Sequence, residues 1–116
     1  MGDTQRSNFE AAMQALAARH ADELAYSRST WLPASNAASN GGPKLTEDIE
    51  AELVRLVDLR CDAEDELIAT PSPTLSAAIW KIEYARKRWE DFTDWPDEWW
   101  EAVMSDLHRV AASERY

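Results

Sequence analysis

Two helical patterns meet at a short stretch of sequence, Leu67-Ile68-Ala69-Thr70-Pro71-Ser72-Pro73-Thr74-Leu75. Pro71 and Pro73 cannot continue a helix that arrives from the N-terminal side. Ser72 followed by Pro73 is typical of an N-cap and a first helical position. The stretch therefore predicts a helix that ends at Thr70, a helix that begins at residue 73, and an antiparallel hairpin between the two.

Apolar residues recur on both sides of this turn in steps of three and four, which is the helical period. Thr46 is a good N-cap for the helix before the turn, and acidic residues follow it, as the positive end of a helix dipole favours. The apolar stripes are Ile49, Leu53, Leu56, Ala63 and Leu67 before the turn, and Leu75, Ala78, Ile79, Ile82 and Trp89 after it.

The rest of the chain predicts two further helices and one long loop. Helices are expected over about residues 8–28, 46–70, 73–93 and 96–112. The segment 29–45 is polar and is broken by proline and glycine, so we expect a mobile loop there. No segment alternates with period two. The fold class is therefore all-α: a small four-helix bundle-like single domain, built on the central hairpin, with a long polar loop after its first helix.

Composition narrows the functional classes. The 116 residues carry 12 Lys+Arg and 22 Asp+Glu, a net charge of −10, which disfavours binding to nucleic acid. Cys61 is the only cysteine, so an intramolecular disulfide is excluded and a reducing cytoplasm is favoured. No apolar run reaches the ~20 residues of a membrane-spanning helix, and no signal peptide is recognised. We expect a cytoplasmic protein without a membrane segment.

The segment from Cys61 to Leu75, with Trp80-Lys81-Ile82-Glu83 after it and Asp106-Leu107-His108-Arg109-Val110 near the end, resembles known sequences. These are short helical proteins of unknown function encoded in alphaproteobacterial genomes and prophages. They share an acidic helix, a Thr-Pro-x-Pro turn and a Trp-Lys-(Leu/Ile)-Glu motif. The resemblance covers about residues 55–110. It implies a bacterial, phage-linked setting and no catalytic residues.

The helix over 73–93 combines aromatic and basic residues on the side away from Leu75 and Ile82. Aromatic rings among cations can grip an acidic peptide or stack on a base. Alternatively, this helix is buried on both sides and its neighbours cover the rings. The candidate partner-binding residues are Trp80, Lys81, Tyr84, Lys87, Arg88 and Trp95.

A second candidate surface is acidic and lies opposite the apolar stripe of the helix over 46–70. Its residues are Asp58, Asp62, Asp65 and Glu66. A solvated helix surface that maintains solubility is one interpretation, and a surface that competes for a basic partner is the other. Arg60 falls inside the apolar stripe and comes opposite Glu83 when the hairpin is paired across its turn. We therefore expect a partly buried Arg60–Glu83 ion pair that fixes the helix register.

Support for catalysis is thin. Asp62, Asp65 and Glu66, or Glu98 and Glu101, could share one Mg²⁺, but such pairs arise readily among 22 acids. We expect no cofactor, no metal and no catalytic residues. The expected function is a non-enzymatic protein-interaction module, namely an adaptor, an inhibitor or a small regulatory subunit with an unidentified protein partner. The alternatives are a self-associating structural protein, which forms a homo-oligomer, and a metal-dependent hydrolase of a small anionic substrate.

Overall fold

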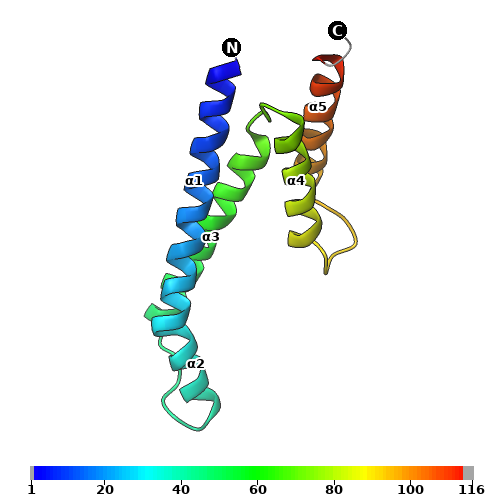
Figure 1. The fold of residues 1–116 in the computed structure, drawn as a ribbon. Coiled ribbons are helices and arrows are strands. Elements are labelled where there is room, and N and C mark those ends of the chain that lie inside the picture. Colours follow the sequence, from blue (N-terminus) through cyan, green and yellow to red (C-terminus); the bar gives the residue numbers. More distant parts are fainter. Residues whose placement is uncertain (1, 114–116) are drawn as a thin grey trace. The chain divides into compact units, whose positions relative to one another are not determined.

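The computed structural model describes residues 2–113, and every regular element in that range is a helix. The helices are α1 (Gly2–Tyr26), the π-helix η1 (Ser27–Trp31), α2 (Leu32–Ser39), α3 (Glu47–Ala69), α4 (Leu75–Arg88) and α5 (Asp97–Ser113), shown in Figure 1. Within the described residues there is no strand. The predicted all-α, bundle-like class is therefore confirmed.

The predicted loop over 29–45 is wrong up to residue 39, because the backbone stays helical to Ser39, and only the residues between α2 and α3 form a connection. Pro33 does not end the helix: the backbone is helical on both sides of it, although the proline cannot donate to the turn before it. The turn before it widens into η1, in which the backbone N–H of Leu32 reaches back to the carbonyl of Ser27. A π-turn of this kind lets a helix continue past a local disturbance.

The helical run ends instead at the glycine pair that follows Asn40. Gly41 adopts a φ of +84°, the left-handed conformation that favours glycine. The backbone N–H of Gly42 then bonds the carbonyl of Ala37 at 2.8 Å, which is the long bond of a Schellman cap. A Cβ built at Gly42 would lie 2.7 Å from that carbonyl oxygen. Both glycines are therefore needed for this helix end.

The other helix bounds differ by a few residues from the predicted ones. α1 begins at Gly2 and not at residue 8, and α4 ends at Arg88 and not at residue 93. The N-cap of α4 is Thr74, whose side chain accepts a bond from the backbone N–H of Ala77, and not Ser72. Ser72 has another role in the structure, described below. The short connection between α3 and α4 agrees with the predicted turn.

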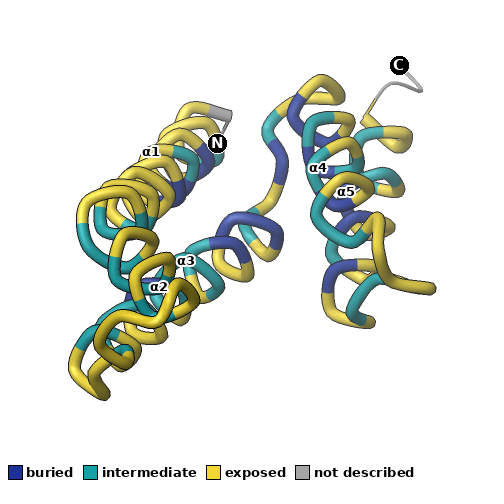
Figure 2. The backbone as a smooth tube through the Cα atoms, turned by 90° about the horizontal axis from the view of Figure 1, so that it is seen from below, coloured by how far each residue is buried: buried dark blue, intermediate teal, exposed yellow. Residues whose placement is uncertain are grey.

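The chain divides into two compact units. The first contains the chain up to Met13 together with everything from Asp65 onward, and the second is Gln14–Glu64. In the first unit, α4 and α5 form an antiparallel pair: Lys81 contacts Asp106, and Tyr84 and Trp89 contact Trp99. Ile68, Ala85 and Trp99 lie at the centre of its core. Figure 2 shows how buried residues gather in α4, α5 and the end of α3.

In the second unit, α1 from Gln14 onward lies antiparallel to α3 up to Glu64, and η1 and α2 also belong to this unit. The hydroxyl of Tyr26 donates to the carbonyl of Ile49 at 3.1 Å, and Arg60 bonds Glu23. Leu16 and Leu56 are its buried apolar side chains among the described residues. The unit therefore buries little apolar surface between its long helices.

Candidate functional site

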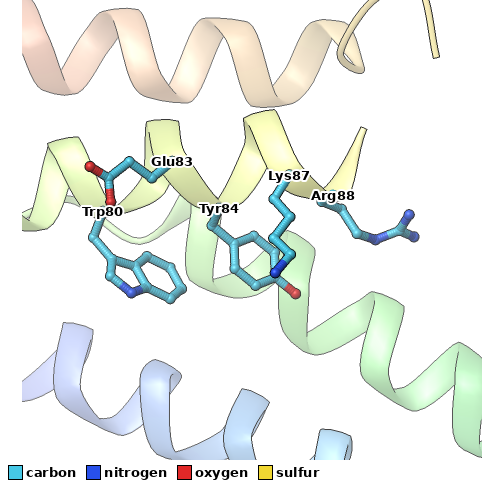
Figure 3. A pocket seen from close by; sticks show the side chains of 5 residues that line it. All are labelled: Trp80, Glu83, Tyr84, Lys87 and Arg88. Atoms are coloured by element: carbon cyan, nitrogen blue, oxygen red, sulfur yellow. The ribbon is translucent and has the colours of Figure 1, made fainter. Parts of the chain in front are cut away.

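A groove on α4 is lined by five side chains that Figure 3 shows from close by: Trp80, Glu83, Tyr84, Lys87 and Arg88. Its volume is about 370 Å³. Four of these residues belong to the predicted partner-binding set, and Glu83 is the fifth. The i, i+3, i+4, i+7 and i+8 spacing brings them to one side of α4, because a helix turns once every 3.6 residues.

The wall of the groove is aromatic. The rings of Trp80 and Tyr84 stack with centroids 5.1 Å apart and planes inclined by 20°. The ring of Tyr84 in turn lies against that of Trp99 of α5, with centroids 6.3 Å apart. Trp99 packs edge-on against Trp89, with centroids 5.4 Å apart. Aromatic pairs at these separations are favourable beyond the area they bury. Trp80 and Tyr84 are half-buried, so each ring is held on one side and leaves part of its surface at the groove.

The rim of the groove is cationic. Arg86, Lys87 and Arg88 form the last turn of α4, where positive charge is favourable beside the negative end of the helix dipole. The guanidinium of Arg88 lies 4.3 Å from the centre of the Trp89 ring, a cation–π contact that orients it. Lys87 is exposed. A second, open hollow of about 570 Å³ adjoins the rim and is lined by Glu83, Arg86, Lys87 and Glu90.

Two of the six predicted partner-binding residues do not line the groove, and the first of them is Lys81. Its side chain is fully buried, and Nζ donates to the carbonyls of Ile68 and Thr70 and to Oδ2 of Asp106, the last at 2.7 Å. The three acceptors use all three ammonium hydrogens. Lys81 therefore caps the C-terminal end of α3 from inside the unit, and its predicted role in partner binding is wrong.

Asp106 of α5 completes this buried cluster. It accepts bonds from the backbone N–H and the hydroxyl of Ser72, from Lys81 and from Arg109, which also donates to the carbonyl of Ser72. Burial raises the pKa of Asp106, but the bonds from Lys81 and Ser72 lower it by more, so its pKa lies below the ordinary value. For Lys81, burial lowers the pKa more than Asp106 raises it. The cluster binds the α3–α4 turn to both following helices.

This cluster was missed in the sequence, although a signal for Lys81 is present there. Lys81 falls at helical spacing between Ala78 and Ala85, so it occupies the small-residue stripe that α4 turns inward. No pattern marks Asp106 and Arg109 as its partners, because they lie 25 and 28 residues further on. All three nevertheless belong to the short motifs on which the resemblance rests.

Trp95 lies in a separate aromatic pair. Its ring stacks on Trp100 with centroids 4.6 Å apart, and Asp94 bonds both the backbone N–H of Trp95 and the indole N–H of Trp100. These contacts fix the start of α5. Trp95 does not line the α4 groove, so the structure does not bring it together with Trp80 and Tyr84.

Arg60 has two carboxylate partners, Glu23 and Glu64, and neither of them is the predicted partner Glu83. Its Nε donates to Glu23 at 2.9 Å and its Nη1 to Glu64 at 3.1 Å. Burial lowers the pKa of Arg60, and the two carboxylates raise it by more. The predicted partly buried ion pair at Arg60 therefore exists, but it joins α3 to α1 within the second unit. Glu83 is exposed at the groove instead.

The four residues of the predicted acidic surface, Asp58, Asp62, Asp65 and Glu66, are all exposed. Asp65 also accepts a bond from the indole N–H of Trp99 at 2.9 Å, so it has a structural role as well. Among residues 2–113, no group of three or more His, Cys, Asp and Glu side chains is arranged to hold a metal ion.

Comparisons of the chain with family models, with curated proteins and with solved structures find no match. None of the described helices combines the length and the apolar character that a membrane-spanning segment needs.

Proposed function

We propose that this protein is a non-enzymatic protein-interaction module and that the α4 groove binds its partner. The observation that carries the proposal is the stacked Trp80–Tyr84 pair beside the cationic last turn of α4. Tryptophan, tyrosine and arginine are the residue types that dominate binding energy at protein interfaces. Such a surface suits an adaptor, an inhibitor or a small regulatory subunit.

The groove stands on rigid supports, which favours binding without rearrangement. Ala85, directly beneath it, is fully buried, and Tyr84 rests on Trp99, itself 2% exposed. Arg88 is oriented by Trp89. Side chains held in place before binding lose less conformational freedom when the partner arrives, and affinity rises accordingly.

The chemistry of the groove favours an acidic segment with an apolar anchor. An apolar side chain of the partner would lie against the Trp80 and Tyr84 rings, and its carboxylates would approach Lys87 and Arg88. Nucleic acid would also find rings and cations here, but the net charge of −10 opposes a polyanion along its whole length. A protein segment presents its charges locally and avoids most of this repulsion. We place the interaction in the cytoplasm, in keeping with the single cysteine.

The test compares two double variants of the tagged chain in pull-downs from host lysate, read by quantitative mass spectrometry. Trp80→Ala with Lys87→Glu alters the groove. Trp31→Ala with Lys44→Glu makes the same chemical changes in the second unit, at a half-buried tryptophan and an exposed lysine.

We expect one foreign protein to be recovered in stoichiometric amount with the wild type and the control, and at least ~10-fold less with the groove variant, since losing one interface tryptophan typically costs ~2 kcal/mol or more. Equal recovery with the groove variant would show that another surface binds the partner. Recovery of the bait alone in every sample would contradict the proposed function.

A further inference from the structure

The α4–α5 pair exposes a row of large apolar side chains on one of its faces. Leu75, Ile79, Trp100 and Met104 are between 41% and 44% exposed, and Ile82 and Leu107 between them are half-buried. Apolar residues scattered singly over a surface are ordinary, but a contiguous set marks an interaction site.

All of these residues lie on the same side of the pair. The inward-facing residues are Ala78, Lys81 and Ala85 on α4, and Trp99, Val103 and Asp106 on α5. In both helices the exposed apolar residues come one position after an inward one: Ile79 and Ile82 on α4, and Trp100, Met104 and Leu107 on α5.

One position is a rotation of about 100° in the same sense about each helix axis. Two antiparallel helices seen from one end turn in opposite senses, so these rotations carry both sets to the same face. This apolar face consists of Leu75, Ile79, Ile82, Trp100, Met104 and Leu107.

The apolar face is distinct from the α4 groove. Trp80 and Tyr84 come one position before the inward residues Lys81 and Ala85, so they lie on the other side of the pair. The face also lies wholly within the first unit. An occupant of the apolar face therefore leaves the groove accessible.

We infer that the apolar face binds a second copy of this chain, so that two α4–α5 pairs form an antiparallel four-helix bundle around a two-fold axis parallel to the helices. This axis sets α4 of one copy over α5 of the other at the same level along the bundle. The intramolecular contact of Lys81 with Asp106 fixes the register of α4 against α5. In this register, residue 82 lies beside residue 104 or 105, and residue 86 lies beside residue 100 or 101.

The face is complementary to itself under that symmetry. Ile82 meets Met104 of the other copy, and Ile79 meets Leu107 of the other copy. Arg86, which continues the row on α4 and is exposed, comes to the level of Trp100 and Glu101 of the other copy. Apolar residues thus meet apolar residues, and the one cation in the row meets the level of an indole ring and one carboxylate. An unrelated partner would need to reproduce both features.

Charge gives the association a distinctive dependence on salt. Each copy has a net charge of −10, so two copies repel each other electrostatically, and this repulsion has a longer range than the apolar contact. Salt shortens the range of this repulsion to ~8 Å at physiological ionic strength and to ~3 Å at 1 M. Dimers should therefore become more stable as salt is added.

The experiment is light scattering coupled to size exclusion on the full chain at ~10 and ~200 μM. The face variant is Ile79→Glu with Met104→Glu. The matched control is Leu24→Glu with Val54→Glu, which adds the same charge at leucine and valine side chains that are 49% and 57% exposed in the second unit. Circular dichroism checks the helix content of each protein.

We expect the wild type and the control to reach twice the 13.2 kDa chain mass at the higher concentration, and the face variant to remain at 13.2 kDa. A wild type that stays monomeric at ~200 μM would overturn the inference. So would a face variant that still dimerises, or a control that loses the dimer equally.

If the face variant loses helix content, Ile79→Ser with Met104→Ser replaces it, with Leu24→Ser and Val54→Ser as the control, and the inference is overturned if this milder face variant dimerises as well as the control. The salt dependence of the wild type is a second requirement. The dimer dissociation constant should fall several-fold when NaCl is raised from ~20 mM to ~500 mM, and a constant that rises would contradict the apolar two-fold interface. Neither result depends on whether the α4 groove binds a partner.

Discussion

Among the described residues, the unit that holds α4 and α5 buries nine apolar side chains, whereas Gln14–Glu64 buries two, Leu16 and Leu56. The second unit also leaves Leu24, Leu32 and Val54 largely exposed. Burial of apolar surface is the main favourable contribution to folding. The two units therefore differ in their expected local stability, although their helices are of similar regularity.

Their charged clusters differ in the same direction. In the first unit Lys81 is fully buried with Asp106, and each polar atom of the pair has partners. In the second unit the side chains of Arg60 and Glu23 are 14% and 25% exposed, so water shares the interaction. Single substitutions in the buried cluster should therefore have larger effects, because a charged group that water does not reach depends on its partner far more than one that water solvates.

The largest effect is expected from Lys81→Met. The variant keeps the length of the side chain but leaves two carbonyls of the α3 end without this donor and removes one of the two cations that contact Asp106. Breaking a buried pair in this way costs ~3–5 kcal/mol of unfolding free energy. Urea denaturation measures it, with Lys87→Met as the control at an exposed lysine on the same helix. A loss of unfolding free energy below ~1 kcal/mol would contradict the claim that the Lys81–Asp106 cluster stabilises the first unit.

A smaller loss, of ~1–3 kcal/mol, is expected from Arg60→Met. Glu64 is almost fully buried and would lose this cation, while water partly compensates Glu23. The control is Arg55→Met, because the Arg55–Glu52 pair is exposed and such pairs contribute little. Equal losses in the two variants would show that the second unit gains nothing from the buried position of its cluster.

The stability of the protein at low pH should depend on Asp106. The folded pKa of Asp106 lies below the ordinary value, so its contribution to stability is present above the unfolded pKa of ~4 and is lost as the pH falls through the folded pKa. Ser72→Ala removes one of the bonds that hold the pKa down. We expect the acid-unfolding midpoint of the variant to move to higher pH by a few tenths of a unit or more, measured by circular dichroism. Ser76→Ala, at an exposed serine of α4, should leave the midpoint in place.

The smallest effect is expected from Glu83→Ala. The predicted pairing with Arg60 would make this variant strongly destabilised, but Glu83 is exposed at the groove and Arg60 bonds Glu23 and Glu64. The change in unfolding free energy should stay within ~0.5 kcal/mol. A thermal melt that drops by many degrees would restore the original pairing.

Much of the helical framework could be predicted because its signals are local. The prolines at 71 and 73 and the acidic starts of α3 and α5 mark real helix boundaries. The segment 29–45 differs from its prediction because Pro33 does not stop the helix: the widened turn η1 precedes it and the backbone remains helical to Ser39. The helix ends at the Gly41–Gly42 cap.

The candidate site was predictable in part for the same reason. Trp80, Tyr84, Lys87 and Arg88 share a side of one helix, and helical spacing alone brings them together. The burial of Lys81 and the partners of Arg60 depend on which helices meet and at what level, and spacing along one helix does not contain that information. Periodicity also predicts one apolar stripe that contains Leu75, Ile79 and Ile82, whereas α5 packs against the adjacent alanines and leaves Leu75 and Ile79 exposed and Ile82 half-buried.

The contrast between the two units is tested most directly by native-state hydrogen exchange, read amide by amide. We expect amides in the centres of α4 and α5 to exchange with the slowest rates, near the limit of global unfolding, and those of α1 beyond Gln14 and of α3 before Glu64 to exchange faster through local opening. Uniform protection of both units, or slower exchange in the α1–α3 pair, would contradict this expectation.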